Sequence, residues 1–182
     1  FEEALHGILL PLQGRVGQLW HTGRISIAVE HYVTSQIKQK LYAAINQLPV
    51  AEFGATVVVA CPPGEEHDLA ALAVAYRCRV RGCRVYYLGA NVPVLSLSTL
   101  CREVTPDLTI LSCTIGLADS TAADLIHSLA QEVVPLSKVL AGGQGALVMR
   151  RHFMGANIEV LENFSELDEK LEELTRRFPI PG

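Results

Sequence analysis

From residue 55 onward, apolar runs of strand length alternate with helix-length segments, and this alternation constrains the fold more than any other feature. The first run, Ala55 to Ala60, is rich in valine and free of charge, which is typical of a strand buried on both faces of a parallel sheet. Strands and helices that alternate through short connections predict a parallel sheet covered by helices on both sides. The sequence therefore predicts an α/β, flavodoxin-like (Rossmann-type) domain with a five-stranded parallel sheet over residues 54–180. The expected strands are 55–60, 84–88, 108–113, 138–141 and 158–161, and the expected helices are 67–81, 95–104, 119–133, 146–153 and 165–178.

The N-terminal segment has a different pattern. Residues 2–20 carry apolar side chains at helical spacing, and Gly23 is expected to end this helix. Ser26 offers an N-cap for a second helix that reaches about Leu48. Two helices joined by a tight turn form a hairpin, which rarely buries both of its apolar faces. Residues 1–50 are therefore predicted to form an incomplete helical bundle that acts as a cap.

The composition narrows the range of functions. The formal net charge of -4 and the pI near 5.9 argue against nucleic-acid binding by this segment itself, because phosphate contacts require a basic surface. The five cysteines are odd in number and form no C-x-x-C pair, so we expect a cytoplasmic, reducing environment and neither a disulfide framework nor a zinc site. No apolar stretch is long enough to cross a membrane. Because the first residue is Phe1 and not Met, we expect the sequence to be part of a longer protein.

A histidine on the first predicted strand-to-helix connection is the first candidate ligand. His67 follows the strand 55–60 and so lies at the carboxyl edge of the sheet, where open α/β sheets bind ligands. Glu65, two residues earlier, is placed to hold one ring nitrogen while the other binds a metal. From these residues alone, a solvated loop histidine is the more common explanation.

A glycine-rich loop, Gly142-Gly143-Gln144-Gly145, follows the fourth predicted strand. Glycines there tolerate positive φ and let a ligand approach the backbone closely. The loop lacks G-x-G-x-x-G spacing, because Val148 stands at the place of the third glycine, and it does not follow the first strand. A dinucleotide site is therefore poorly supported, and a P-loop is absent as well.

Three short pieces together resemble the signature of the B12-binding domain family. They are Glu65-x-His67-x-x-Ala70, then Ser112-x-Thr114 after 41 intervening residues, then Gly142-Gly143 after 27 more. The family pattern is Asp/Glu-x-His-x-x-Gly, Ser-x-Leu and Gly-Gly, so Ala70 and Thr114 depart from it. All three pieces follow predicted strands at one edge of the sheet, which is the context that such a motif requires.

This resemblance implies a cobalamin whose own dimethylbenzimidazole base is displaced and whose lower cobalt ligand is His67. It also implies that Glu65 orients and polarises His67, and that Ser112 and the Gly142-Gly143 turn line the slot for the nucleotide tail. The methyl group of Ala70, in place of the family's glycine, is expected to crowd that tail. The neighbouring residues that the resemblance assigns to the cofactor site are Glu66, Asp68, Leu69, Ala70, Thr114 and Gln144.

A second resemblance lies in the predicted helical hairpin and extends to about Phe164. Trp20, nine further residues and then Glu30-His31 are similar to the Trp-x9-Glu-His pattern of the CarH-type photoreceptors, which are light-responsive, adenosylcobalamin-dependent regulators. It implies that Trp20 packs against the upper adenosyl group, that Glu30 bonds to its ribose, and that His31 helps to close the cavity. It also implies that His21 becomes the upper cobalt ligand after light breaks the cobalt–carbon bond. Taken alone, Trp20 is more commonly a core aromatic and Glu30 more commonly a solvated helix carboxylate.

Together these resemblances imply a cobalamin-binding light sensor that regulates transcription and is not an enzyme. The expected cofactor is adenosylcobalamin, with methylcobalamin or hydroxocobalamin as alternatives. The expected partners are further copies of the chain or another protein, and DNA is reached only through a segment absent here. Three alternatives stay open: a corrinoid carrier module of a methyltransferase, a stand-alone cobalamin-binding antirepressor or bilin-linked photoreceptor, and a flavodoxin-like domain without cobalamin. The carrier accounts for Glu65 and His67 but does not require Trp20, His21 or Glu30.

Overall fold

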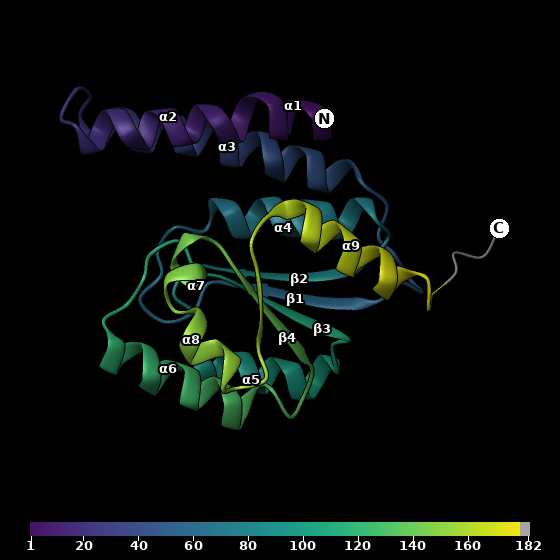
Figure 1. Cartoon of the computed structure of the whole chain (residues 1–182). Helices are drawn as coiled ribbons and strands as arrows, with labels where there is room; N and C mark the ends of the chain where they lie inside the picture. The colour runs from purple at the N-terminus through teal and green to yellow at the C-terminus, as the bar shows by residue number, and fades with distance from the viewer. Residues whose placement is uncertain (179–182) are drawn as a thin grey trace. The chain divides into compact units, whose positions relative to one another are not determined.

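The structure is a computed structural model that describes residues 1–178 and separates into two compact units (Figure 1). The first unit is Phe1–Pro49, and the second begins at Val50. Residue 180, where the second domain was predicted to end, lies outside the described residues. Among residues 1–178, none of the helices is both long and apolar enough to cross a bilayer.

The first arm of the N-terminal unit is a helix with an irregular start. It consists of α1 (Glu2–Ala4), the π-helical segment η1 (Leu5–Leu9) and α2 (Leu10–His21). The π-helical turn lies directly before Pro11, which sits in the first turn of α2. Because proline has no N–H to donate to the preceding turn, a change of hydrogen-bond pattern at this point follows from the sequence.

The turn and the second arm begin where the sequence indicates. Gly23 lies just beyond α2 with a φ of 69°, a left-handed conformation that glycine adopts without strain. Helix α3 (Ile27–Gln47) starts after Ser26, whose hydroxyl accepts a hydrogen bond from the Val29 amide.

Large apolar side chains of this unit divide between its interior and its surface. Leu5, Val16, Ile37 and Leu41 are buried, whereas Ile8, Leu12, Trp20, Ile27, Val29, Tyr32 and Tyr42 are exposed.

The second unit is a doubly wound α/β domain. Within residues 1–178, five parallel strands form one sheet in the order β2-β1-β3-β4-β5, which confirms the predicted flavodoxin-like fold class. The direction in which the sheet grows reverses between β1 and β3, so the loops after these two strands open side by side at the carboxyl edge. The strands are β1 (Thr56–Ala60), β2 (Arg84–Gly89), β3 (Leu108–Ser112), β4 (Lys138–Gly142) and β5 (Glu159–Leu161).

Helices cover both faces of this sheet, as Figure 1 shows. They are α4 (Leu69–Val80), α5 (Val94–Val104), α6 (Asp119–Glu132), α7 (Gln144–Val148), α8 (Arg150–Met154) and α9 (Phe164–Thr175). One face carries α4 and α9, and the other carries α5, α6 and α8. The single helix predicted over 146–153 was wrong, because the chain forms two short helices that meet at Met149. The helix predicted from His67 begins only at Leu69, which leaves the histidine in a loop.

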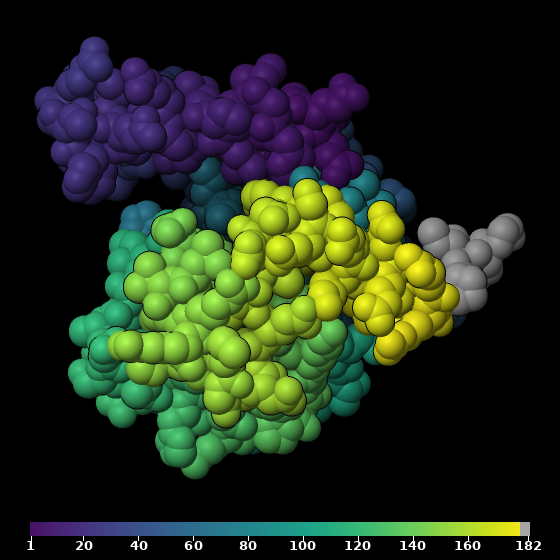
Figure 2. All heavy atoms as spheres, in the orientation of Figure 1, coloured from purple at the N-terminus to yellow at the C-terminus, as the bar shows by residue number. Residues whose placement is uncertain are grey.

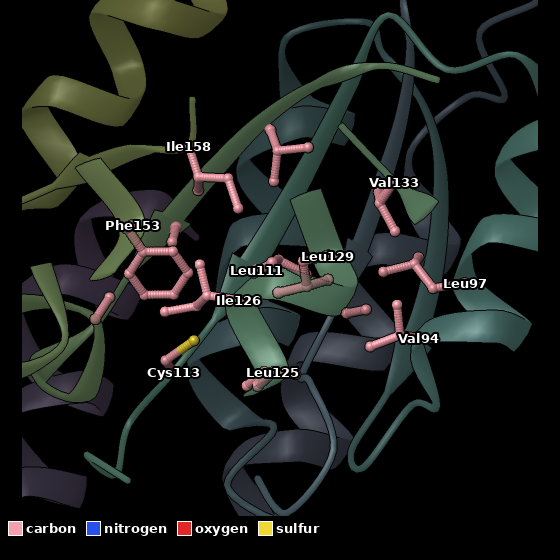
Figure 3. Close-up of a cluster of buried hydrophobic side chains, with 14 of the residues drawn as sticks. Val94, Leu97, Leu111, Cys113, Leu125, Ile126, Leu129, Val133, Phe153 and Ile158 are labelled. Atoms are coloured by element: carbon pink, nitrogen blue, oxygen red, sulfur yellow. The ribbon is translucent and has the colours of Figure 1, made fainter. Parts of the chain in front are cut away.

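Strand β1 is buried on both faces because its side chains alternate between two apolar clusters. Val58 and Ala60 belong to the cluster beside α5 and α6, part of which, including Phe153, is shown in Figure 3. Val57 and Val59 belong to the cluster beside α4 and α9. Full burial of a valine side chain contributes roughly 1.5–3 kcal/mol. Both clusters therefore anchor β1 and, with it, the loop that carries His67.

Candidate functional site

His67 and Glu65 form a hydrogen-bonded pair in the loop between β1 and α4. The Nδ1 atom of His67 lies 2.7 Å from Glu65 Oε1, which also accepts a hydrogen bond of 2.8 Å from the His67 backbone N–H. The His67 side chain is 56% exposed, whereas that of Glu65 is 5% exposed. When Nδ1 donates to Glu65, the neutral ring carries its lone pair on Nε2. Among residues 1–178, Nε2 has no hydrogen-bond partner, so it is free to bind a metal.

Glu65 also joins the first loop to the loop after β3. Its Oε2 atom accepts hydrogen bonds from the backbone amides of Thr114, at 2.6 Å, and Ile115, at 2.8 Å. Hydrogen bonds to an ionised carboxylate are about twice as strong as neutral ones, so this carboxylate is held firmly. The loop that follows β3 therefore fixes the carboxylate that orients His67. Sequence analysis missed Ile115, because a backbone amide contributes the contact and no side-chain pattern reveals it.

Two acidic residues of the first motif form hydrogen bonds that stabilise the loop. Glu66 accepts a hydrogen bond of 2.9 Å from Asn91, and Asp68 accepts one of 2.8 Å from the Tyr87 hydroxyl. Leu69 is buried at the start of α4. Tyr87 lies on β2, and Asn91 lies just after that strand. Neither residue was singled out from the sequence, because neither belongs to a motif.

A cavity of about 360 Å³ lies between the start of α4, the ends of β3 and β4, and the connection from β5 to α9. Its size is within the range of small-molecule pockets. The residues predicted to line or crowd a tail slot, Ala70, Ser112, Gly142 and Gly143, are all among its walls. The remaining walls come from residues that sequence analysis did not select: Val74, Ile110, Leu111, Leu161, Glu162, Asn163, Phe164 and Leu167.

The polar side chains in the walls of this cavity are those of Ser112, Glu162 and Asn163. Ser112 is 4% exposed, and its hydroxyl makes no hydrogen bond to any of residues 1–178. Glu162 already pairs with Arg150 at 2.7 Å, and Asn163 Oδ1 accepts from the Glu166 amide at 3.0 Å. Gln144, which was also predicted near the tail, is an exposed residue at the start of α7 and is not one of the walls.

The glycines at the end of β4 and directly beyond it have two different roles. A Cβ added at Gly142 would meet nothing within 4 Å, and this residue borders the cavity. At Gly143, where φ is 101°, a Cβ would lie 2.4 Å from the carbonyl oxygen of Cys113. At Gly145 it would lie 2.3 Å from the carbonyl oxygen of Ile115. Gly143 and Gly145 therefore let the loops after β3 and β4 pack together, whereas Gly142 leaves room for a ligand.

The cysteines do not add thiolate ligands. Burial, reinforced by the negative charge of Glu65, raises the pKa of Cys113 to about 12, and burial raises that of Cys83 to about 11. Such thiols stay protonated near neutral pH and bind metals poorly. Within residues 1–178, no three histidine, cysteine or acidic side chains are grouped so that they could hold a metal ion. A metal at His67 would thus have to bring most of its ligands with it, as a macrocycle-bound metal does.

Glu30 is the centre of a hydrogen-bond network within the helical unit. Its Oε1 atom accepts hydrogen bonds from Gln13, at 2.9 Å, and Thr34, at 2.6 Å, and Oε2 lies 2.7 Å from His31 Nδ1. Burial opposes ionisation of this carboxyl, but the hydrogen bonds from Thr34, Gln13 and His31 outweigh it and hold its pKa below the ordinary value. Glu30 is therefore a fixed carboxylate and not a freely solvated one.

Trp20 and His21 lie near the same turn of the hairpin as this network. They are the last two residues of α2, whereas Glu30 lies in the first turn of α3. Trp20 follows Gln13 by seven residues, which is two helical turns, so it lies on the stripe of α2 that contacts α3. Trp20 is nevertheless 44% exposed, and His21 is exposed as well. This tryptophan is therefore not a core aromatic of the hairpin.

Acid is expected to destabilise the hairpin through Glu30. Because the pKa of Glu30 is lower in the folded state, its stabilisation is complete above the unfolded value of about 4.3 and is lost as pH falls through the folded value. Urea unfolding followed by circular dichroism should show Glu30→Gln less stable than wild type by roughly 1–2 kcal/mol near neutral pH. This difference should shrink as pH falls below the unfolded value and disappear once pH is below the folded value. Glu3→Gln, at an exposed position, is the control, and a difference independent of pH would contradict this explanation.

The chain is similar to several known proteins. A family model described as a B12 binding domain matches residues 55–174, and a second model with the same description matches residues 1–45. The HTH-type transcriptional repressor CarA of Myxococcus xanthus is 30% identical over 165 residues, which cover 91% of this chain and 54% of CarA. The HTH-type transcriptional repressor CarH of the same organism is 31% identical over 144 residues, which cover 79% of this chain and 48% of CarH.

The chain thus spans about half the length of these curated relatives. Among solved structures, the monomethylamine corrinoid protein of Methanosarcina barkeri matches with a TM-score of 0.73 and 17% identity. The match covers 94% of this chain and 82% of that protein. At this identity the structural match shows a shared fold.

Proposed function

This chain belongs to the B12 binding domain family, and from that membership we propose that it binds a cobalamin with His67 as the lower cobalt ligand. The observation that carries the proposal is that the two ring nitrogens of His67 differ in their hydrogen bonding. Nδ1 is held by Glu65, and Nε2 has no partner among residues 1–178. A carboxylate on the far nitrogen fixes the tautomer and raises the basicity of the nitrogen that binds the metal.

The tail of the cobalamin, with its displaced base, occupies the cavity between α4 and α9. Its walls are mainly apolar, which suits a planar aromatic base, and the Ser112 hydroxyl is available for one polar atom. Because Gly142 has no side chain, the tail can approach its backbone closely, and a Cβ there would meet no protein atom within 4 Å. Ala70 narrows the cavity by one methyl group at the position of the family's glycine.

The helical unit binds the upper ligand, and adenosylcobalamin is the form that we propose. When bound, this cofactor supplies a cobalt–carbon bond that light breaks. Glu30 contributes a carboxylate that its hydrogen bonds to the protein hold in place and that would accept a hydrogen bond from a ribose hydroxyl, and Trp20 contributes an exposed aromatic surface. The imidazole of His21 is exposed and would be available as the cobalt ligand after illumination.

The output of this light sensor is a change in gene regulation. Support comes from CarA and CarH, which are named HTH-type transcriptional repressors. The net charge of -4 argues against DNA contact by this segment itself, because phosphate binding requires a basic surface, and we propose that DNA is contacted through a segment that is not in this sequence. The signal would pass through contacts with further copies of the chain or with another protein. A corrinoid carrier would use Glu65 and His67 in the same way but would need neither the Glu30 network nor His21.

The light response distinguishes these functions. The purified chain is titrated with adenosylcobalamin and with methylcobalamin, and absorption spectra are recorded in darkness and after green light. We expect the adenosyl form to bind about tenfold more tightly or better, because Glu30 then gains a charge-assisted hydrogen bond. After illumination the spectrum of His21→Ala should differ from that of wild type, while the dark spectra coincide. Equal affinity for both forms, together with identical illuminated spectra, would exclude the light sensor and favour the carrier.

A further inference from the structure

A buried arginine lies behind one wall of the tail cavity. Arg77, on α4, is 5% exposed, and its guanidinium carbon lies 4.8 Å from the centre of the Phe164 ring. Phe164 is the first residue of α9 and one of the walls of the cavity. A cation held over the face of an aromatic ring restricts where that ring can lie. The position of this wall therefore depends on Arg77.

Asp168 on α9 holds Arg77 in turn. Arg77 Nη1 forms an ion pair with Asp168 Oδ2, and Arg81 Nη2 lies 2.8 Å from Asp168 Oδ1. Arg77 lies in the last turn of α4, and Arg81 directly follows the helix, four residues later. Two cations at the C-terminal end of α4 thus share one carboxylate of α9, the helix shown in yellow in Figures 1 and 2. This network ties the two helices that enclose the cavity.

The chemistry of the cavity discriminates between nucleotide bases. Ser112 offers one hydroxyl, Glu162 Oε1 pairs with Arg150, and the side-chain oxygen of Asn163 accepts from the Glu166 amide. A purine such as adenine carries an amino group and several ring nitrogens, and any of these that faced the Phe164 ring would lose water without gaining a partner. A benzimidazole has one ring nitrogen left for a hydrogen bond once the other carries the ribose. The apolar wall formed by Phe164 therefore suits the benzimidazole.

We propose that Arg77 is a positioning residue that holds Phe164 as a wall of the tail cavity, and that this wall makes the chain select cobamides with a benzimidazole-type base over those with a purine base. The inference rests on the proposed function, because it requires the nucleotide tail to enter this cavity. Arg77 acts through Phe164 and touches no reacting atom.

Equilibrium titration followed by absorbance tests the inference with three ligands. They are cobalamin, its analogue with adenine as the base, and cobinamide, which lacks the nucleotide. Wild type should bind cobalamin roughly tenfold to a hundredfold more tightly than the adenine analogue. Arg77→Met should reduce this preference below about threefold and leave cobinamide affinity unchanged. The variant should fold, since Asp168 keeps Arg81 as a partner, and Arg102→Met, on α5, is the matched control.

A double variant separates positioning from a general structural role. In the Phe164→Leu background, Arg77→Met should cause no further change in base preference, because the residue through which it acts is already gone. Additive effects of the two substitutions would overturn the role of Arg77, and equal affinity of wild type for both bases would overturn base selection. Failure of wild type to bind cobinamide with a spectral change that depends on His67 would instead overturn the proposed function, and this inference with it.

Discussion

Replacement of His67 by alanine is expected to lower the affinity for cobalamin by more than about 100-fold, since loss of a partner that merely orients a ligand already costs 10–100-fold. The spectrum of the base-off, histidine-bound cofactor should be lost with it. The physical reason is that, among residues 1–178, no three histidine, cysteine or acidic side chains are grouped so that they could hold the metal without His67. Absorbance titration with purified protein measures both effects.

Two further variants serve as an intermediate case and a control for the His67→Ala result. Glu65→Gln removes the charge that polarises the ring but keeps an oxygen for the amides of Thr114 and Ile115, so its affinity should fall between wild type and His67→Ala. His127→Ala changes an exposed histidine of α6 and should bind as wild type does. Unchanged affinity and spectrum in His67→Ala would show that the cobalt is not bound by this imidazole.

The largest stability effect is expected at Gly143. Alanine there would have to adopt a φ near 101° and place its Cβ 2.4 Å from the carbonyl oxygen of Cys113, so the backbone must move. We expect Gly143→Ala to lower the free energy of unfolding by about 3 kcal/mol or more, since an unfavourable φ alone costs about 1–3 kcal/mol. Urea denaturation of the cofactor-free protein measures this loss directly.

The adjacent glycine provides the matched control. Gly142→Ala should change the free energy of unfolding by less than about 1 kcal/mol, because its Cβ would meet no protein atom. That Cβ would project into space bordered by the cavity, so affinity for cobalamin should fall while affinity for cobinamide, which has no nucleotide, stays the same. If both glycines tolerated alanine equally in stability, the close packing of the loops after β3 and β4 would be wrong.

Sequence patterns were most informative where they report local periodicity or backbone conformation. The valine run of β1 predicted a strand buried on both sides, and its residues do alternate between two cores. Gly23 and Ser26 marked the turn and the helix start within a residue. The spacing of Glu65 and His67 placed them in one loop, where the structure joins them by a hydrogen bond. These features depend on residues close in sequence, so the sequence alone carries them.

Contacts between distant residues were decided by the tertiary structure. Arg77 and Asp168 are separated by 91 residues, and nothing in the local pattern of either α4 or α9 indicates that they pair. The amide of Ile115 reaches Glu65 across 50 residues and has no side-chain signature at all. By itself the sequence determined the order of strands along the chain and the place of His67 at the carboxyl edge of the sheet. The tertiary structure alone decided two things: α4 packs against α9, which sets the walls of the cavity, and the loop after β3 packs against Glu65, which holds His67 in place. The physical reason is that these contacts join segments far apart in the sequence, so no local periodicity of residue types indicates them.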